Sequence, residues 1–135
     1  MISGIICEFN PFHAGHKHLI DQVKCHPGDA VVCVMSGNFV QRGTFAVYDK
    51  RTRTEAALKG GADLVLELPT VWAASSAESF ATGAVALLRA CGVVDVLSFG
   101  SESGDPAALA AAAACLDSEA YRAGLSRFLD EGMPF

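Results

Sequence analysis

Four short runs of apolar residues, separated by longer segments with helix signals, constrain the fold of this chain most strongly. The runs consist mostly of apolar, often β-branched residues, as is typical of strands buried in a parallel sheet; they span residues 2–7, 30–35, 64–68 and 93–99. Parallel strands need crossover connections, and right-handed crossovers prevail. The pattern therefore predicts an α/β fold with a doubly wound parallel sheet.

Helix start and stop signals fill the segments between and after these runs. Five helices are expected, and the residues at or next to their starts are Gly15, Asp49, Ser75, Asp105 and either Asp117 or Ser118. Ser75 and Glu78 have the spacing of a capping box. Pro106 stands at the first helical position after Asp105, where proline is favoured. The expected order of elements is β-α-β-α-β-α-β-α-α.

Composition excludes several classes of protein. The 135 residues are 51% hydrophobic and 19% charged, so the chain can bury a core without disulfides or a structural metal. The five cysteines form no C-x-x-C pair, which favours buried, reduced thiols. No signal peptide is recognisable, and the longest apolar stretch, at 107–116, is too short to span a bilayer. We therefore expect a cytoplasmic protein that does not bind membranes.

The net charge of −5 is unevenly distributed. Residues 1–89 carry eight basic and eight acidic side chains, whereas residues 90–135 carry two basic and seven acidic ones. Within the neutral part, residues 42–59 hold five basic groups against two acidic ones. A local positive patch in an acidic protein suits an anionic small ligand better than a long polyanion.

Polar residues and glycines cluster directly after three of the expected strands. They occupy residues 8–16, 36–43 and 100–102. Ligands of doubly wound sheets bind beyond the carboxyl ends of the strands. These three segments are therefore the candidate site.

The sharpest signal in these segments is a pair of histidines, His13 and His16, at the expected start of a helix. Two imidazoles three residues apart can face the strand ends together. Gly15 leaves room for a phosphate near the backbone, and the free N–H groups of a helix N-terminus favour an anion. Such donors matter most when charge develops at the α-phosphorus of a nucleotide. We predict that His13 and His16 are catalytic in an attack on that phosphorus, with pyrophosphate leaving.

Zinc ligation is the competing interpretation of the histidines. The candidate ligands are His13, His16 and His18 with Cys25 or His26. No carboxylate or paired cysteine completes a convincing set, so we expect no protein-bound metal, and His18 and His26 are more simply surface residues. A P-loop, a dinucleotide-binding glycine motif and a hydrolase nucleophile elbow are all missing from the sequence.

Residues 4–16 resemble the first motif of the HIGH-type nucleotidylyltransferase superfamily, which has a Rossmann-like fold. More narrowly, four motifs in order resemble the bacterial tRNA(Met) cytidine acetate ligase family; they span residues 8–16, 35–43, 61–69 and 99–102. Four spaced motifs are far more specific than one. The resemblance implies that ATP and acetate form acetyl-adenylate, which then acetylates N4 of the wobble cytidine of elongator tRNA(Met).

The resemblance also implies a set of ATP-binding residues, with Mg²⁺ carried by the nucleotide. These residues are Ile6, Cys7, Glu8, Phe9, Asn10, Pro11, Phe12, His13, Ala14, Gly15, His16, Lys17, His18, Leu19 and Gly100. Family members are longer, so residues 1–135 are expected to be an N-terminal nucleotidyltransferase-like catalytic domain. Most contacts with tRNA(Met) and further ATP contacts are expected in regions beyond Phe135.

Three residues after the second strand are possible substrate or phosphate contacts: Ser36, Asn38 and Arg42. The alternative for Asn38 is that it only shapes the turn. Arg51 and Arg53 contact tRNA phosphates or, more simply, form a solvated helix face.

Two carboxylates at strand ends have an open role. Glu67 either binds Mg²⁺ or a ligand hydroxyl, or makes a structural hydrogen bond. Glu102 either lies near the ribose of the nucleotide or is an acidic residue close to a helix without a ligand. Two other functions also stay open. One is a nucleotidylyltransferase that acts on a phosphorylated metabolite, and the other is an inactive nucleotide- or RNA-binding module.

Overall fold

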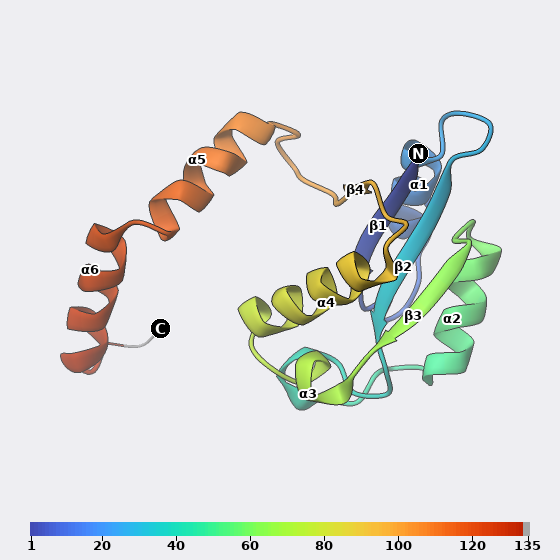
Figure 1. Ribbon diagram of the computed structural model, residues 1–135. Coiled ribbons are helices and arrows are strands. Elements are labelled where there is room, and N and C mark those ends of the chain that lie inside the picture. Colours follow the sequence, from blue (N-terminus) through green and yellow to red (C-terminus); the bar gives the residue numbers. More distant parts are fainter. Residues whose placement is uncertain (134–135) are drawn as a thin grey trace. The chain divides into compact units, whose positions relative to one another are not determined.

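A computed structural model describes residues 1–133, which form two compact units (Figure 1). The first unit is Met1–Phe99, and the second begins at Gly100. None of the helices in residues 1–133 combines the length and the apolar character that a bilayer crossing requires.

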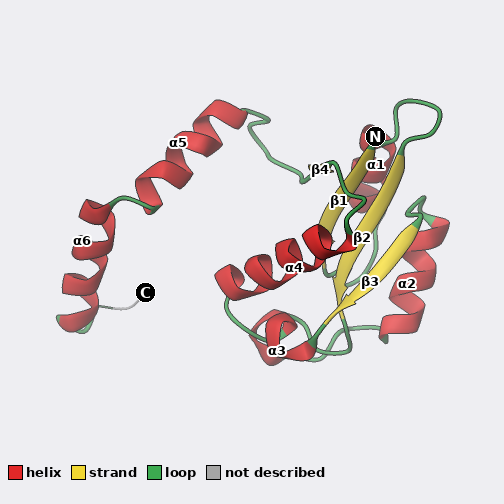
Figure 2. Ribbon diagram, in the orientation of Figure 1, coloured by secondary structure: helices red, strands yellow, loops and turns green. Residues whose placement is uncertain are grey.

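A four-stranded parallel sheet forms the centre of the first unit (Figure 2). Its strands are β1 (Ile2–Cys7), β2 (Ala30–Ser36), β3 (Leu64–Leu68) and β4 (Val96–Leu97). They are arranged in the order β3-β2-β1-β4. After β1 the chain adds β2 and then β3 on one side of β1, and β4 pairs with the other side of β1. This arrangement confirms the predicted fold class.

Helices cover both faces of the sheet. The connections contain α1 (Ala14–Val23), a short 3-10 turn η1 (Gln41–Gly43), α2 (Lys50–Lys59), α3 (Thr70–Ala73) and α4 (Ala77–Cys91). On one face Ile5, Val31 and Cys33 pack with Ile20 of α1 and Ala57 of α2.

The opposite face packs against α3 and α4. Val32 and Val34 of β2 contact a cluster that includes Phe80 and Leu88 of α4. Neighbouring residues of β2 thus enter different clusters, because successive side chains of a strand point to opposite faces. Burial on both faces explains why the strand runs are apolar without alternation.

The expected capping box at Ser75 is wrong by one residue. Ser76 is the N-cap of α4, and its hydroxyl accepts the N–H of Ser79 at 3.3 Å. The hydroxyl of Ser75 instead donates to the carbonyl of Trp72 at 2.6 Å, where the unpredicted helix α3 ends. Because α3 takes up the residues before Ser75, the start of α4 moves along the chain.

The fourth strand is much shorter than the expected span of 93–99. Only Val96 and Leu97 pair with β1, and hydrogen bonds from the N–H groups of Asp95 and Ser98 flank them. Within residues 1–133 this segment contacts β1 on one side alone, and both paired residues of β4 are exposed. Regular pairing with β1 therefore covers two residues of the expected span 93–99.

The second unit contains two capped helices, α5 (Pro106–Leu116) and α6 (Glu119–Asp130). Asp105 accepts the N–H groups of Ala107 and Ala108, and Ser118 accepts the N–H of Tyr121. These caps confirm the expected starts of both helices. Neither helix has a buried residue in the described part of the chain.

All five cysteines are free thiols, but they are not all buried. Cys33 is buried in the sheet, Cys7 and Cys91 are half-buried, and Cys25 and Cys115 are exposed. The expectation of buried thiols is therefore wrong for the last two. Cys25 lies in the turn after α1 and Cys115 near the end of α5, both outside the apolar strand runs.

Candidate nucleotide-binding site

The turn between β1 and α1 brings the histidine motif to the carboxyl edge of the sheet. Phe9 adopts a positive φ of 47° and is 2% exposed, which places its ring in the core. Phe12 meets the Phe9 ring edge-on at 5.0 Å between centroids. The aromatic contacts fix the path of the turn, and α1 starts directly after it at Ala14.

His13 and His16 together form the N-terminal cap of α1. The Nδ1 atom of His13 accepts the N–H of Gly15 at 3.1 Å, and Nδ1 of His16 accepts the N–H of His13 at 3.3 Å. The two rings stack with centroids 3.7 Å apart. The motif is thus a reciprocal capping box in which imidazoles take the places usually held by hydroxyls and carboxylates.

This cap determines which ring nitrogens are free. A neutral imidazole has one donor nitrogen and one acceptor nitrogen, and both Nδ1 atoms act as acceptors here. The proton of each neutral ring is therefore on Nε2, which takes no part in the cap. Two Nε2–H groups on stacked rings can donate to oxygens of one anion.

His16 is kept neutral by its surroundings. Burial lowers the pKa of His16 from its ordinary value, and the neighbouring His13 lowers it further. A neutral ring keeps its Nδ1 acceptor for the cap and its Nε2–H for a ligand. The tautomer required for hydrogen bonding to phosphate is thus the one that the helix start requires.

The expected free N–H groups at the start of α1 are largely absent. Gly15 donates to Nδ1 of His13, and His16 and Lys17 donate to the His13 carbonyl at 3.0 and 3.1 Å. A Cβ atom at Gly15 would lie 3.1 Å from Cε1 of His13. Glycine at this position therefore makes room for the capping ring, and the donors offered to a ligand are imidazoles rather than these amides.

Cys7 is a structural thiol at the end of β1. Its Sγ atom contacts the carbonyl of Val34 at 3.5 Å. Burial, followed by the neighbouring Cys33, raises the pKa of Cys7 well above its ordinary value. The thiol is therefore neutral and a poor nucleophile.

Arg53 connects the loops that follow β1 and β2, and it is 1% exposed. Its Nη1 donates to the Glu8 carbonyl at 2.5 Å and its Nε to the Tyr48 carbonyl at 3.0 Å. Its Nη2 donates to the carbonyls of Ser36 and Gly37. The guanidinium fork thus satisfies carbonyls from both loops at the carboxyl edge of the sheet.

The expectation that Arg53 belongs to a solvated helix face is wrong. Arg53 and Ala57 are the two buried residues of α2, and their spacing of four places them on one helix face. Arginine is seldom fully buried without a partner, so the local sequence alone does not mark Arg53 as a residue of the inner face. Arg51, by contrast, is exposed as expected.

Ser36 and Asn38 have structural partners in the loop after β2. Ser36 is buried, and its hydroxyl contacts Nη1 of Arg53 at 3.4 Å, which is a structural role; its expected contact with substrate stays a prediction. Asn38 accepts the N–H of Lys50 at 2.9 Å through Oδ1, which is the turn-shaping role. Arg42 is exposed in a turn with a φ of 68°, and its ligand role stays a prediction.

Glu8 anchors this loop to the histidine turn. Its carboxylate accepts the N–H of Gln41 at 2.6 Å, and Oδ1 of Asn10 accepts the N–H of Val47 at 2.7 Å. The loop after β2 is therefore fixed to the turn after β1 at two points besides Arg53. The sequence motifs at 8–16 and 36–43 meet in space as expected.

Glu67, at the end of β3, pairs with Lys50 at the start of α2. Its carboxylate accepts from Nζ of Lys50 at 2.7 and 2.9 Å, which is the structural alternative rather than a free ligand carboxylate. The pair borders a pocket of about 390 Å³ between α2 and β3, whose floor includes Met35 and Val65.

The structure does not assemble the competing zinc set. His18 and His26 are exposed, as expected, and both Nδ1 atoms of the capping histidines are occupied by backbone N–H groups. Within residues 1–133 the group of three metal-type ligands that does come together is Cys25, His26 and Asp29, at the other end of α1.

The expected ATP-binding residues 6–19 form one continuous segment at the carboxyl edge of the sheet. Ile6 and Cys7 end β1, residues 8–13 form the turn, and residues 14–19 begin α1. Gly100 and Glu102 belong to the second unit, and their roles stay predictions.

Comparison with known proteins identifies the family of this chain. The chain matches the HIGH Nucleotidyl Transferase family over residues 1–135. A Clostridium perfringens protein named tRNA(Met) cytidine acetate ligase is 50% identical over 137 residues, which cover 99% of this chain and 34% of the relative. An Acetivibrio thermocellus protein of the same name is 49% identical, with 99% and 33% covered.

Solved structures agree as well. The crystal structure of Thermotoga maritima TmcAL bound with alpha-thio ATP matches with a TM-score of 0.85 and 44% identity, over 99% of this chain and 33% of that chain. The apo form of the same protein matches with a TM-score of 0.86 and 45% identity, over 99% and 32%. The chain spans about a third of the length of these relatives. Because the family match extends over its whole length, the chain belongs to the HIGH nucleotidyl transferase family.

Proposed function

We propose that this protein uses ATP to activate acetate as acetyl-adenylate and transfers the acetyl group to N4 of the wobble cytidine of elongator tRNA(Met). The observation that carries the proposal is the capped histidine pair, which offers two Nε2–H donors at the carboxyl edge of the sheet. In this proposal residues 6–19 and Gly100 bind ATP, and His13 and His16 are the catalytic residues.

The chemistry requires phosphate stabilisation rather than a protein nucleophile. An acetate oxygen attacks the α-phosphorus, a new P–O bond forms, and the bond to the bridging oxygen breaks as pyrophosphate leaves with the electron pair. The Nε2–H groups of His13 and His16 donate to phosphate oxygens as negative charge grows there. Cys7, whose raised pKa keeps its thiol neutral, has no role as a nucleophile.

The cytidine then completes the reaction. Its N4 attacks the acetyl carbonyl of the adenylate, the new C–N bond forms, and AMP leaves with the electron pair of the broken C–O bond. The proton of N4 passes to solvent or to a base. Most of the surface for tRNA(Met) lies in parts of the longer protein outside these residues.

Mg²⁺ supplies charge neutralisation at the phosphates when it is bound. The three carboxylates near Arg53 at this edge are already engaged: Glu8 with the N–H of Gln41, Asp49 with the N–H of Thr52 and Glu67 with Lys50. This fits a Mg²⁺ that is held by phosphate oxygens and carried with ATP. Arg42, exposed in its turn, is the side chain we assign to the acyl-adenylate or its phosphate.

The comparisons support the substrate assignment. The two curated relatives share the name tRNA(Met) cytidine acetate ligase, and the T. maritima neighbour is described as bound to an ATP analogue. These matches, at identities of 44–50%, extend over 99% of this chain.

Acetate-dependent exchange of labelled pyrophosphate into ATP tests the proposal. The C. perfringens relative serves as the positive control, and His16→Ala in this protein as the negative control. We expect exchange that needs acetate and is lost in His16→Ala. Exchange with a phosphorylated metabolite but not with acetate would establish a different nucleotidylyltransferase. ATP binding without any exchange would establish a binding module, and either result overturns the proposal.

A further inference from the structure

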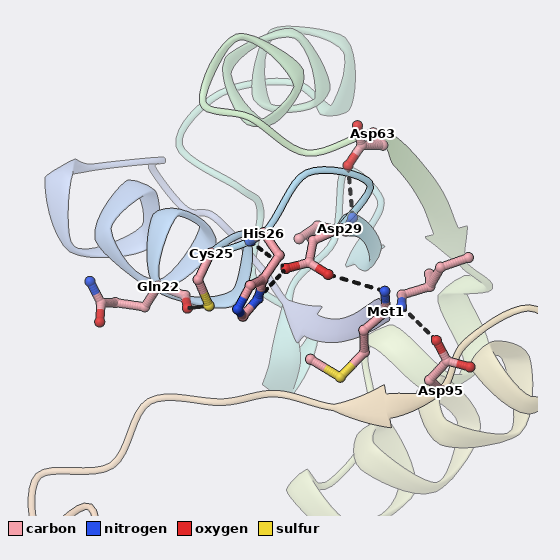
Figure 3. A network of polar contacts seen from close by, with 9 residues as sticks. Met1, Gln22, Cys25, His26, Asp29, Asp63 and Asp95 are labelled. Atoms are coloured by element: carbon pink, nitrogen blue, oxygen red, sulfur yellow. Dashed lines mark hydrogen bonds and ion pairs between the residues drawn. The ribbon is translucent and has the colours of Figure 1, made fainter.

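A second cluster of reactive side chains lies at the far end of α1 from the histidine pair. Cys25, His26 and Asp29 occupy the turn between α1 and β2 (Figure 3). The ten residues of α1 span about 15 Å at 1.5 Å per residue, so this cluster is no part of the nucleotide site. Nothing in the proposed reaction uses it.

The donor atoms of the cluster already have nearly the spacing of metal ligands. One ligand atom from each residue lies within 4.8 Å of the other two, and Nδ1 of His26 is 3.4 Å from Oδ2 of Asp29. Bonds of roughly 2.0–2.2 Å at a tetrahedral angle separate a nitrogen and an oxygen ligand by about 3.4 Å. The imidazole and the carboxylate therefore need little movement, and the thiol needs a shift of no more than about 1 Å.

Asp29 is held in place before any metal binds. Its side chain is 6% exposed, Oδ1 accepts from the Met1 ammonium at 3.0 Å, and Oδ2 accepts the N–H of His26 at 2.8 Å. Each carboxylate oxygen has two lone pairs, so Oδ2 can bind a metal and keep this hydrogen bond. Fixed partners of this kind orient a ligand and raise the affinity of a site.

The other two donors are accessible. Cys25 and His26 are exposed, and Sγ of Cys25 contacts the carbonyl of Gln22 at 3.2 Å. Metal binding replaces the thiol proton, which is released to solvent. Both side chains can therefore turn toward Oδ2 of Asp29 without disturbing the core.

We propose that Cys25, His26 and Asp29 form a surface site for a zinc-class divalent cation. Thiolate and imidazole donors favour Zn²⁺ or Co²⁺ over Mg²⁺ or Ca²⁺, which prefer oxygen ligands. Three protein ligands leave a fourth tetrahedral position for water. Bound metal ties the end of α1 to the start of β2, so it stabilises this connection rather than taking part in catalysis.

Titration of the 135-residue chain with Co²⁺ under reducing, thiol-free conditions tests the site. Tetrahedral Co²⁺ with a thiolate ligand gives a charge-transfer absorption in the near ultraviolet. We expect this absorption in the wild type and in Cys115→Ser, which removes the other exposed cysteine, and we expect its loss in Cys25→Ser. His26→Ala and Asp29→Asn should weaken Co²⁺ binding at least about tenfold.

Calorimetric titration with Zn²⁺ gives a second readout that does not depend on the thiolate band. Circular dichroism of each variant separates lost binding from lost folding, and His26 is exposed enough for its variant to fold. Absence of the band in the wild type, or a band that survives Cys25→Ser, contradicts the proposal. Unchanged Zn²⁺ affinity in a folded His26→Ala also contradicts it.

Discussion

Replacing the buried guanidinium of Arg53 should cause a large loss of stability. Arg53→Met keeps a long side chain in the space beside Ala57 but removes five hydrogen bonds, four of them to backbone carbonyls. The bonds to Ser36 and Gly37 are buried, so these carbonyls would lose their partner away from water. The loops after β1 and β2 would lose a shared anchor at the same time.

The magnitude follows from the two buried carbonyls. A buried acceptor without a partner costs about 1–3 kcal/mol, so the pair costs about 2–6 kcal/mol. The carbonyls of Glu8 and Tyr48 are only half-buried, so water can replace the arginine as their hydrogen-bond donor. Their contribution to the loss of stability is therefore smaller. We expect Arg53→Met to lower the free energy of unfolding by about 3–5 kcal/mol, a large part of the roughly 5–15 kcal/mol typical of a domain.

Urea denaturation followed by circular dichroism measures this loss. Arg51→Met is the matched control, because Arg51 is the exposed arginine of the same helix and should lose no more than about 0.5 kcal/mol. Arg53→Lys should fall between the two, since an ammonium cannot reach carbonyls of both loops together. A loss below about 1 kcal/mol in Arg53→Met, or one equal to that of Arg51→Met, refutes the reasoning.

Three further predictions concern the site and its supports. Burial and the neighbouring imidazole lower the pKa of His16, so the unfolded chain gains this proton at higher pH than the folded one. The contribution of neutral His16 to the free energy of unfolding should be fully present above about pH 6.5, and it should fall as the pH drops from there to the lowered pKa of the folded state. His16→Asn keeps a side-chain acceptor for the cap but cannot titrate. Urea denaturation at several pH values should therefore show a smaller loss of stability toward acid pH in this variant. Gly4→Ala should lower the free energy of unfolding by about 1–3 kcal/mol, because the new Cβ would lie 2.8 Å from Cδ1 of Leu88. This loss should be smaller when Leu88 is also replaced by valine, as measured by thermal unfolding. Ser76→Ala should cost about 1 kcal/mol through loss of the α4 cap, and Ser75→Ala less, by the same measurement.

Each of these has a contradicting result. The titration argument fails if His16→Asn keeps the full acid step of the wild type. The packing argument fails if Gly4→Ala is neutral, or if its cost is the same with and without the shorter side chain at Leu88. The corrected helix start fails if Ser75→Ala is the more damaging of the two serine variants.

The strands β1, β2 and β3 could be predicted from the sequence because their burial requires apolar residues throughout. A strand covered on both faces must be apolar throughout, and these three runs are largely so. The caps at Asp49, Asp105 and Ser118 could be predicted for a similar reason, since each depends on one side chain and the next few N–H groups.

Features that depend on distant partners could not be predicted in this way. The length of β4 depends on how far its backbone stays in register with β1, and an apolar sequence does not show this. Arg53 reads as a surface residue because arginine is almost never fully buried unless paired, and its partners are carbonyls from segments 5 to 45 residues away.

The position of the histidine motif could be predicted, but its internal geometry could not. Its place after β1 follows from the order of elements, whereas the use of both Nδ1 atoms in the cap depends on ring orientations. The same applies to Gly15, which is small because the His13 ring occupies the space next to it. Local sequence identifies the candidate site, and side-chain packing decides which atoms it offers.

The central claim is that His13 and His16 present Nε2–H groups to a nucleotide phosphate. Long-range ¹H–¹⁵N NMR of the imidazoles during titration with ATP tests it most directly, because the spectrum distinguishes the two neutral tautomers of each ring. We predict the Nε2–H form for both residues and shifts of these nitrogens with ATP, while His26, beyond the far end of α1, stays unchanged. Nδ1–H tautomers in His13 and His16, or shifts confined to His26, would contradict the account.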